Sequence, residues 1–492
     1  MRDFALLYIN GQRHEVRGRQ AGMMVSDYLR YDLALTGTKI VCAEGDCGAC
    51  TLLRWFPFPQ KRSDPSPFQA LNSCIATVAQ LDGSSLVTVE GLRQANGGEF
   101  TPVQEAMVKA NGSQCGFCTP GFVMAITALV ERKLSEPKTD KVISEKQAKN
   151  YLTGNLCRCT GYTPILYASM ALDLNHCSSL TSKFLTSRIK KELRDVLQIP
   201  LTISSDSFSC FAPISALSAT KFKVKNPQSL LLSAGTDLGV LSNKNKIKFH
   251  QTMSLHQLPE LYQWKKTTKG GRLYVGARVT VAELRRITEK TIPEFSRFLD
   301  LFASPQIKNV ATLVGNVANA SPIADTPPFL LVANSLITIA GPKGIRTLPL
   351  ENYYLAYKKT ALGIGEWIQG IEFDIPSPDE SLALFKSSQR KDLDISCINA
   401  AFRISWSDKK KSRVTRAQLA MGGVAAIPLR LPKSERFLKG KEISPEVVSQ
   451  AVATVHSELN PLSDLRGTSA YRRLVLENFL LKFFSSLVVR QS

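Results

Sequence analysis

The sequence predicts a multidomain protein of the α+β class. Three observations support this prediction: the length of the chain, the cysteine-rich patterns of its first third, and a change of character near Phe211, where short strands begin to alternate with helices. A chain of 492 residues corresponds to two to four domains with ample core. Its composition, 44% hydrophobic and 21% charged, is an ordinary balance for a soluble protein.

The N-terminal part follows a β-grasp plan. Residues 4–16 predict two strands around an Asn-Gly pair, which is a strong short-range hairpin signal. We expect a helix near 24–30, a returning strand over 51–55 and a closing strand over 86–92. Residues 55–68, rich in Pro, Phe, Lys and Ser, are expected to form a surface excursion.

The next part of the chain is predicted to be helical. Helical periodicity and a first-turn proline indicate helices over 102–110, 121–132 and 144–153, which together would form a small bundle. Residues 178–209 are Ser/Thr-rich with a short basic insert, and we expect a linker with some local structure.

The first cysteine set has the C-x4-C-x2-C…C spacing of a plant-type 2Fe-2S loop. Two glycines within it, Gly45 and Gly48, would let the backbone wrap closely and direct amide N–H groups at the sulfurs. The set consists of Cys42, Cys47, Cys50 and Cys74.

The second cysteine set combines a C-x-x-C pair with a C-x-C pair, each at the edge of an expected helix. Four thiolates suit either zinc or an iron–sulfur cluster, so this set alone does not decide between them. A disulfide framework or structural zinc stays an alternative for both sets, although disulfides are rare in reducing compartments and zinc ribbons repeat C-x2-C. The set consists of Cys115, Cys118, Cys157 and Cys159.

The remaining cysteines, Cys177, Cys210 and Cys397, are isolated and are expected to be buried small hydrophobic residues. The five histidines are scattered, which argues against a histidine-based site. The formal charge of +21 raises the question of nucleic acid, but the basic residues are spread along the chain with only short runs such as 409–411. We expect a solvated basic surface or one that faces an acidic partner subunit, and no nucleic-acid ligand.

Apolar runs in the sequence stay well below the eighteen or more residues of a membrane span. The sequence also shows no secretory leader. We therefore expect a cytoplasmic protein without a membrane anchor.

A strand that turns sharply through small residues predicts an anion site. Consecutive backbone N–H groups in such a turn could cradle a pyrophosphate, although a plain strand and turn would explain the pattern equally well. The G-x-G-x-x-G fingerprint is absent, which excludes a Rossmann dinucleotide site, and the glycine-rich 341–344 stretch is expected to be a hairpin turn. The turn segment comprises Leu231, Leu232, Ser233, Ala234, Gly235, Thr236, Asp237 and Leu238.

Both cysteine patterns, in this order and at this separation, resemble the iron–sulfur region of the xanthine oxidase family of molybdenum hydroxylases. The resemblance implies a β-grasp 2Fe-2S ferredoxin domain, a helical-bundle 2Fe-2S domain, and an α/β FAD-binding domain (PCMH-like) with a C-terminal α/β subdomain. The implied segments are 1–92 for the plant-type ferredoxin domain, 93–177 for the helical 2Fe-2S domain, 178–209 for the linker, 210–378 for the FAD-binding domain and 379–492 for the C-terminal flavoprotein subdomain.

The resemblance extends to residues 304–325 and 385–395 and implies the FAD contacts. Besides the turn segment, Phe302 would meet the flavin, the 312–316 stretch the diphosphate, and Asp325 a hydroxyl network. Lys386 would stand near the isoalloxazine, where positive charge favours the reduced ring; the alternative for its segment is an amphipathic surface stretch. The implied contacts outside the turn segment are Phe302, Thr312, Leu313, Val314, Gly315, Asn316, Asp325 and Lys386.

The resemblance also implies an electron relay without a catalytic residue in this chain. The family's molybdopterin–molybdenum centre would lie on a large partner subunit, in a heterotetramer or higher assembly with two of each subunit. Electrons would pass from molybdenum to the Cys115 set, the Cys42 set, FAD and then NAD. Gln114 would reach the pterin across the interface, or alternatively would only cap a helix.

Overall fold

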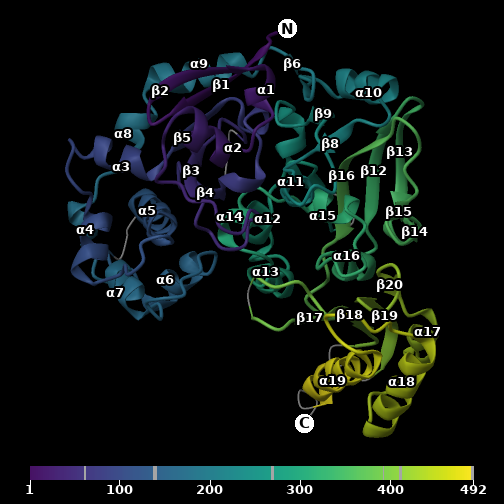
Figure 1. Ribbon diagram of the computed structural model, residues 1–492. Helices are drawn as coiled ribbons and strands as arrows, with labels where there is room; N and C mark the ends of the chain where they lie inside the picture. The colour runs from purple at the N-terminus through teal and green to yellow at the C-terminus, as the bar shows by residue number, and fades with distance from the viewer. Residues whose placement is uncertain (60–62, 137–140, 268–270, 392, 409–412, 489–492) are drawn as a thin grey trace. The chain divides into compact units, whose positions relative to one another are not determined.

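The computed structural model describes residues 1–59, 63–136, 141–267, 271–391, 393–408 and 413–488 (Figure 1). The chain forms two compact units. Unit 1 comprises Met1–Tyr262, Thr280–Glu283 and Ala303–Thr312, and unit 2 comprises Gln263–Val279, Leu284–Phe302 and Leu313–Ser492.

Unit 1 begins with a five-stranded mixed sheet of order β2-β1-β5-β3-β4. The predicted hairpin is confirmed: its turn residues Asn10 and Gly11 have φ of 50° and 79°. The expected helix near residue 24 is a short α-helical turn, α2, that continues as a π-helical turn. The strands are β1 (Phe4–Ile9), β2 (Gln12–Arg17), β3 (Thr51–Trp55), β4 (Gln69–Asn72) and β5 (Ser84–Val87), and the helical turns are α1 (Gly18–Ala21), α2 (Val25–Asp27) and η1 (Tyr28–Asp32).

The strand expected over 86–92 is wrong in its second half. The strand ends at Val87, and Val89–Ala95 is helix α3. The reason is a tertiary contact, because the Asn10 side chain accepts a hydrogen bond from the backbone N–H of Thr88 at 2.9 Å, where the strand ends. The β-branched residues of this stretch favour a strand locally, but the contact overrides that preference.

The expectation of a surface excursion over 55–68 is also wrong for the residues described. Four of its aromatic side chains are at most 9% exposed, and the Arg54 guanidinium lies 4.3 Å from the ring centroid of one of them, Phe56. Residues 60–62 lie outside the described part of the chain. The buried rings are Trp55, Phe56, Phe58 and Phe68.

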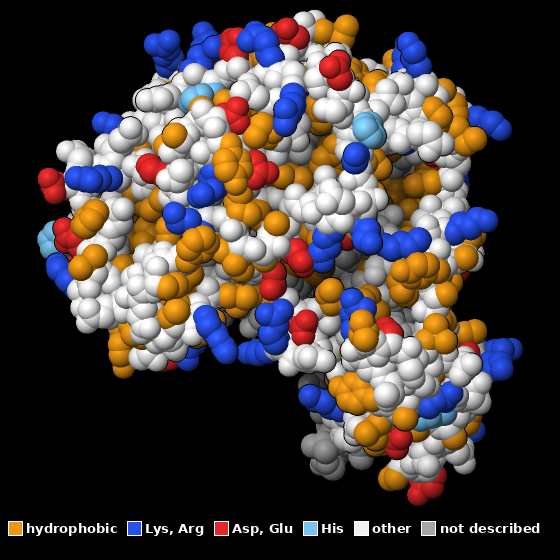
Figure 2. Space-filling view, viewed as in Figure 1, with side chains coloured by type: hydrophobic (Ala, Val, Ile, Leu, Met, Phe, Trp, Pro, Cys, Tyr) orange, Lys and Arg blue, Asp and Glu red, His pale blue; other side chains and the backbone are white. Residues whose placement is uncertain are grey.

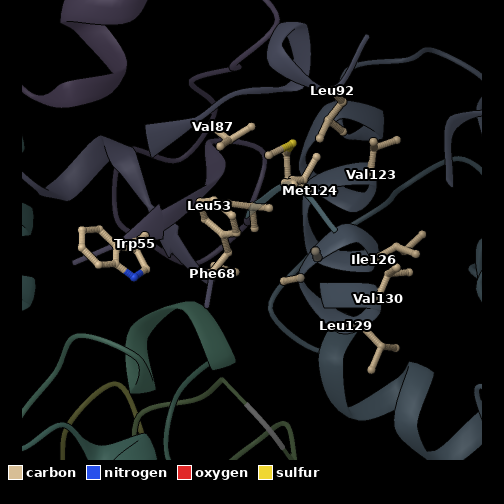
Figure 3. Packing of buried hydrophobic residues seen from close by; sticks show 14 of the residues in the cluster. Leu53, Trp55, Phe68, Val87, Leu92, Val123, Met124, Ile126, Leu129 and Val130 are labelled. Atoms are coloured by element: carbon tan, nitrogen blue, oxygen red, sulfur yellow. The ribbon is translucent and has the colours of Figure 1, made fainter. Parts of the chain in front are cut away.

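The helical part of unit 1 begins as predicted. Capping boxes at Thr101 with Gln104 and at Ser144 with Gln147 start α4 and α6, because each satisfies two free backbone donors at a helix end. Helix α5 packs its apolar side chains, such as Met124, against Leu53 and Val87 of the first sheet (Figure 3). The two N-terminal domains therefore share one core. The helices are α4 (Pro102–Lys109), α5 (Thr119–Ser135), α6 (Glu145–Leu152) and α7 (Thr163–Met170).

Residues 178–209, expected to be a linker with some local structure, form mostly regular helices and a strand. Helix α8 (Thr181–Phe184), helix α9 (Ser187–Val196) and strand β6 (Leu201–Ser204) occupy most of the segment. Ile189, Leu193 and Val196 of α9 are buried in the shared core. This amphipathic pattern explains why the segment folds onto the domain that precedes it.

The second sheet of unit 1 has the order β6-β7-β9-β8. Strands β7 and β8 both run parallel to β9, so helices connect them. Four short 3-10 turns and one short helix complete the described part of the unit. The elements are β7 (Ser209–Ala212), α10 (Ala216–Lys225), β8 (Leu230–Leu232), α11 (Thr236–Asn243), β9 (Gln251–Ser254), η2 (Ser73–Ile75), η3 (Ala79–Leu81), η4 (Leu174–His176), η5 (Pro259–Tyr262) and α14 (Pro305–Lys308).

Unit 2 contains an antiparallel sheet of order β10-β11-β16-β12-β13. The 341–344 stretch is a tight hairpin turn, as predicted, and Gly344 has φ of 101°. The elements are β10 (Trp264–Thr267), β11 (Arg272–Gly276), α13 (Pro293–Asp300), α15 (Leu313–Ala318), α16 (Pro327–Val332), β12 (Leu336–Gly341), β13 (Gly344–Pro349), β14 (Tyr354–Ala356), β15 (Lys359–Thr360) and β16 (Trp367–Asp374); helix α12 spans Val281–Thr288.

A four-stranded sheet with three helices ends unit 2, and its helices near 444–455 and 469–486 confirm the prediction. The core includes Phe402 and Leu419 from the sheet and Phe484 from the last helix. The elements are β17 (Ser381–Ser387), β18 (Ile398–Trp406), β19 (Val414–Gly422), β20 (Leu429–Arg430), α17 (Pro432–Leu438), α18 (Pro445–Glu458) and α19 (Ser469–Val488).

Surface charge is scattered as the sequence indicates. On the face shown in Figure 2, Lys and Arg side chains alternate with acidic and apolar ones. The 409–411 run lies outside the described residues. Within the described residues, no helix is both long and apolar enough to cross a membrane.

Candidate iron–sulfur and flavin sites

The first cysteine set comes together in unit 1. The Cys42 thiol hydrogen-bonds with the thiols of Cys47 and Cys74, and the Cys50 thiol with that of Cys74. Backbone N–H groups of Glu44 and Cys47 each lie 3.4 Å from the Cys42 sulfur and donate to it. Cys50 and Cys74 are buried, and Cys42 and Cys47 are half-buried.

The loop around this set needs its glycines. Gly45 and Gly48 have φ of 73° and 68°, a region that residues with a side chain rarely adopt. A Cβ on Gly48 would lie 2.2 Å from the carbonyl oxygen of Gly154, which belongs to the second cysteine loop. The Asn72 amide also holds the loop by donating to the Gly45 carbonyl at 2.6 Å.

The thiols of this set shift one another's pKa in opposite directions. Hydrogen bonds from Cys47 and Cys74 lower the pKa of Cys42 far below its ordinary value, and the hydrogen bond to Cys42 raises the pKa of both partners. Such a set binds a cation by releasing its remaining protons, because thiolates are the metal ligands.

The second set forms two thiol pairs. Cys118, at the N-cap of α5, pairs with Cys157, and Cys115 pairs with Cys159. Burial, and to a lesser degree the hydrogen bond with the Cys157 thiol, raises the pKa of Cys118 to about 12. The backbone N–H of Thr160 donates to the Cys157 sulfur at 3.5 Å.

Pairs of thiols suit a 2Fe-2S cluster, because such a cluster takes two ligands on each of its irons. The residues present therefore fit this group at both sets. Within the described ranges, no three or more His, Cys, Asp or Glu side chains are arranged to hold a single metal ion.

Exposure distinguishes the two sets. Cys115 and Cys159 are exposed, and so is Gln114 beside them. The first set, in contrast, has no fully exposed member among its four cysteines.

A buried polar bridge joins the two cysteine loops. The backbone N–H of Leu156 donates to the Cys47 carbonyl at 3.0 Å, and the Asn155 amide donates to the Gly48 carbonyl at 3.0 Å. The Gln306 amide, which is fully buried, donates to Asn155 at 2.8 Å. Sequence reasoning missed Asn155 and Gln306, because no spacing relates residues that lie 151 positions apart.

The predicted anion turn is present in unit 1. Strand β8 ends at Leu232, and Gly235, with φ of 71°, is the N-cap of α11. The hydroxyls of Ser233 and Thr312 lie 3.2 Å apart. The turn therefore contacts the first residue of the 312–316 stretch, which is also predicted to bind the diphosphate. Leu232 and Thr312 are buried, Asp237 is exposed, and the remaining turn residues are half-buried.

In unit 2, Asp325 and Lys386 are neighbours. The Lys386 ammonium on β17 lies 2.8 Å from an Asp325 carboxylate oxygen, and the two side chains are 3% and 11% exposed. The Ser396 hydroxyl and the Asn399 amide also donate to Asp325. Sequence reasoning missed Ser396 and Asn399, and it did not pair Lys386 with the carboxylate.

The other predicted flavin residues of unit 2 differ in exposure. Leu313 and Val314 of α15 are buried, whereas Gly315, Asn316 and Phe302 are half-buried. The side-chain oxygen Oδ1 of Asn316 accepts hydrogen bonds from the backbone N–H and the hydroxyl of Thr326. Arg390 and Asp394 are joined by a 2.9 Å hydrogen bond from the Arg390 backbone N–H.

We expect Lys386→Met to lower the free energy of unfolding by about 3 to 5 kcal/mol, because it leaves the largely buried Asp325 carboxylate without its cation. Urea unfolding would measure the loss. The double variant Lys386→Met with Asp325→Asn should recover much of it, since no unpaired charge remains. A single variant as stable as the wild type would contradict the prediction.

Comparisons with known proteins find similar domains along most of the chain. Three family models match: a [2Fe-2S] binding domain over residues 88–170, the FAD binding domain in molybdopterin dehydrogenase over 206–378, and the CO dehydrogenase flavoprotein C-terminal domain over 383–487. Xanthine dehydrogenase 1 of Arabidopsis thaliana is 30% identical over 98% of this chain, and the xanthine dehydrogenase of Oryza sativa subsp. japonica is 28% identical over 98%. This chain spans only 39% of the length of each.

Solved structures show the same fold. A carbon monoxide dehydrogenase from Hydrogenophaga pseudoflava that lacks the Mo-pyranopterin moiety has a TM-score of 0.54 and 22% identity, covering 60% of this chain and 100% of that one. The quinoline 2-oxidoreductase from Pseudomonas putida 86 has a TM-score of 0.53 and 22% identity, covering 58% of this chain and 99% of that one.

The fold and the matched domains define the chain as an iron–sulfur flavoprotein of mixed α+β architecture. The matched domains are similar to the FAD and 2Fe-2S domains of molybdenum hydroxylases, which are oxidoreductases.

Proposed function

We propose that this chain is the electron-transfer subunit of a xanthine dehydrogenase. A large partner subunit carries molybdopterin and molybdenum and oxidises hypoxanthine or xanthine to urate, and the electrons leave through this chain to NAD. The observation that carries the relay is the pair of thiol sets, whose loops are joined by the hydrogen bond between Leu156 and Cys47. Support for xanthine comes from the named relatives, which match nearly the whole chain.

Two 2Fe-2S clusters are held by the two thiol sets in this proposal. The exposed set receives electrons from the partner, because Cys115 and Cys159 are the ligands that reach the surface. Gln114, exposed beside them, faces the partner's pterin. The hydrogen bond from Leu156, which precedes the ligand Cys157, to the ligand Cys47 then gives a short path between the two sets.

FAD is held by the residues of the anion turn, by the 312–316 stretch, and by Phe302, Asp325 and Lys386. Backbone N–H groups of 233–237 and of 312–316 bind the diphosphate, Phe302 contacts the flavin ring, and Asp325 with Lys386 orients the adjoining polar groups. When bound, FAD accepts single electrons and passes pairs on. Two copies of each subunit, in the cytoplasm, form the assembly.

A related hydroxylase is the second candidate. The solved structures with this fold include carbon monoxide dehydrogenase and quinoline 2-oxidoreductase, so the partner could oxidise carbon monoxide, an aldehyde or an aromatic substrate instead. A stand-alone flavin-dependent NADH:acceptor reductase is the third. It predicts NADH turnover by the chain without a molybdenum partner.

Metal and flavin analysis of the anaerobically purified chain tests the cofactors. Two 2Fe-2S sites predict about four iron, four sulfide and one FAD per chain. Co-purification with the partner should add molybdenum, and the complex should then reduce NAD with xanthine but not with carbon monoxide or quinoline. Zinc in place of iron would overturn the cluster assignment, and xanthine-independent turnover would favour one of the alternatives.

We expect Cys115→Ser to lose one cluster, so that iron falls from about four to about two per chain, because the exposed set no longer has four thiolates. Electron paramagnetic resonance should then show one of the two cluster signals. Cys177→Ser is the control, since Cys177 is a half-buried cysteine outside both sets. Unchanged iron in Cys115→Ser, or an equal loss in the control, would contradict the assignment.

A further inference from the structure

Helix α11 packs against residues 74–80, the segment that carries Cys74, and runs in the opposite direction to it. The Asn243 amide, at the end of the helix, donates to the Cys74 carbonyl at 2.7 Å. At the other end, the Gln80 amide donates to the Ala234 carbonyl at 3.3 Å, just before the helix begins. The contacts therefore follow residues 74–80 in one direction and α11 in the other.

The middle of the helix packs directly against the backbone of the same segment. A Cβ on Gly239 would lie 2.2 Å from the backbone carbonyl oxygen of Ile75. Glycine in a helix interior costs about 1 kcal/mol relative to alanine, so its presence here needs a packing reason. The close approach to Ile75 supplies that reason.

Asn243 also ties the helix to the other side of the first cysteine loop. Its amide donates to the Ala43 carbonyl at 2.7 Å, directly after Cys42, and the neighbouring Lys244 pairs with Glu44 at 3.0 Å. The side-chain amide of Asn243 thus bridges the two backbone segments that carry Cys42 and Cys74.

The opposite end of α11 is the predicted anion turn. Gly235 caps the helix, and a Cβ there would lie 2.2 Å from the Gln80 amide nitrogen. The helix has eight residues, which at about 1.5 Å per residue correspond to about 12 Å. The length of α11 therefore sets the separation between the carbonyl of Cys74, a predicted cluster ligand, and the anion turn.

We propose that α11 and residues 74–80 form a rigid spacer that sets the distance between the first cluster and the FAD diphosphate at the turn, and so positions bound FAD for electron transfer. Gly239 and Asn243 are its positioning residues: Gly239 permits the close approach, and Asn243 locks the helix end to the ligand loop. This inference rests on the proposed function, in which the first thiol set holds a cluster and the turn binds FAD.

Gly239→Ala tests the spacer. Alanine favours the helix itself but pushes it away from Ile75. We expect transfer of one electron from reduced flavin to the oxidised first cluster, measured by pulse radiolysis, to slow severalfold, because the turn moves away from the cluster. FAD content should stay that of the wild type.

Ser242→Ala is the matched control, since it changes the neighbouring residue on the same helix. It should transfer electrons at the wild-type rate. Asn243→Ala is the second variant, in case Gly239→Ala does not fold, and it should slow the same step. In the protein stripped of FAD, both positioning variants should also speed hydrogen–deuterium exchange of the α11 amides, whereas the control should not.

Wild-type transfer rates in the folded positioning variants, with FAD and both clusters bound, would overturn the spacer and leave the proposed function intact. Slowing in Ser242→Ala to the same degree would overturn it as well. A wild-type chain without FAD or without the first cluster would instead overturn the proposed function on which the inference rests.

Discussion

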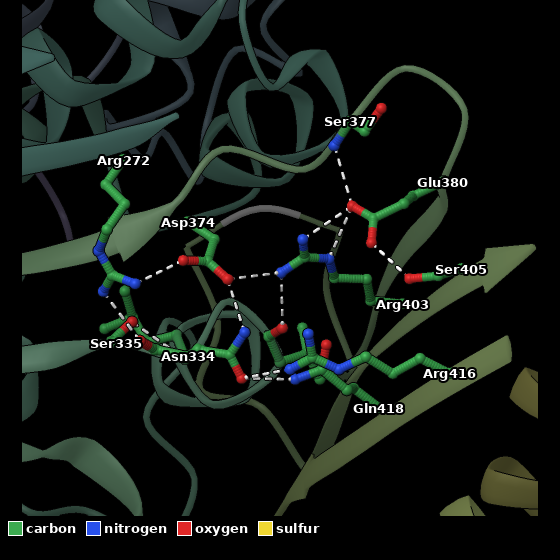
Figure 4. Close-up of polar contacts among 12 residues, drawn as sticks. Arg272, Asn334, Ser335, Asp374, Ser377, Glu380, Arg403, Ser405, Arg416 and Gln418 are labelled. Carbon is green, nitrogen blue, oxygen red and sulfur yellow. Dashed lines mark hydrogen bonds and ion pairs between the residues drawn. The ribbon is translucent and has the colours of Figure 1, made fainter. Parts of the chain in front are cut away.

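Replacing Arg403 with Met is expected to lower the free energy of unfolding by about 3 to 5 kcal/mol, because it leaves the Glu380 carboxylate, whose side chain is only 13% exposed, without its cation. Arg403 is 6% exposed on β18, and its guanidinium donates to Glu380 at 2.7 and 3.0 Å and to Asp374 at 3.2 Å (Figure 4). Burial raises the pKa of Glu380, but the hydrogen bonds from Arg403 and Ser405 outweigh it and keep the pKa below its ordinary value. The carboxylate is therefore charged and depends on Arg403.

The two partners of Arg403 differ in what they lose. Asp374 keeps a second cation, since Arg272 lies 2.5 Å from its other oxygen. Glu380 keeps two neutral donors from the described residues, the Ser405 hydroxyl and the backbone N–H of Ser377. Adding Glu380→Gln to Arg403→Met should therefore recover much of the stability.

Urea unfolding followed by tryptophan fluorescence would measure the effect of Arg403→Met. Arg346→Met is the matched control, because Arg346 pairs with Glu366 at 2.7 Å but its side chain is 41% exposed. An exposed pair contributes about 0 to 1 kcal/mol. Equal losses in the two variants would show that burial does not decide the contribution of Arg403.

The network around Arg403 also has a positional consequence. It joins the end of β16, which carries Asp374, to β18, to β19 and to Glu380, the residue directly before β17. Asn334 adds contacts to Asp374 and Gln418 (Figure 4). Strand β17 carries Lys386, the partner of Asp325. Loss of Arg403 should therefore loosen that ion pair as well.

Asp82→Ala is expected to cost about 3 to 5 kcal/mol, because it strands a buried guanidinium. Asp82 is fully buried in unit 1 and binds Arg2 through both carboxylate oxygens. It also accepts from the backbone N–H of Leu6 at 2.8 Å and lies 3.1 Å from a ring nitrogen of His256. Thermal or urea unfolding would measure the loss, and a cost below about 1 kcal/mol, the range of an exposed pair, would contradict it.

The same carboxylate predicts a pH dependence. Burial raises the pKa of Asp82, but the hydrogen bond to His256 and the charge of Arg2 outweigh it and lower the pKa below its ordinary value of 3.8. A depressed pKa stabilises the folded state above the unfolded value, and this contribution is lost as pH falls through the folded pKa. The stability difference between wild type and Asp82→Asn should therefore be constant from pH 7 to about 5 and shrink below about pH 4.

An unchanged difference down to pH 3 would show that Asp82 is not the titrating group. Asp379→Asn is the control, because the Asp379 carboxylate is exposed to solvent whereas that of Asp82 is fully buried. Its difference from wild type should stay near zero across the range.

Local patterns predicted the elements whose signals lie within a few residues. The Asn10-Gly11 hairpin, the helices of the cysteine-rich bundle and the last two helices all form where periodicity and turn residues indicated them. Capping and turn preferences act between neighbours in the chain, so the sequence alone carries them. The strand expected over 86–92 is wrong where the distant Asn10 side chain decides the conformation.

The sequence by itself determined the chemistry: two sets of four thiols at cluster spacing, a strand and turn suited to an anion, and a chain rich enough in apolar residues to bury them. Only the tertiary structure decided which side chains serve these groups. Asn243 reaches Ala43 across 200 positions and Gln306 reaches Asn155 across 151. Lys386 meets Asp325 across 61 positions. Such contacts depend on how sheets and helices pack, and packing brings together residues that no spacing in the chain relates.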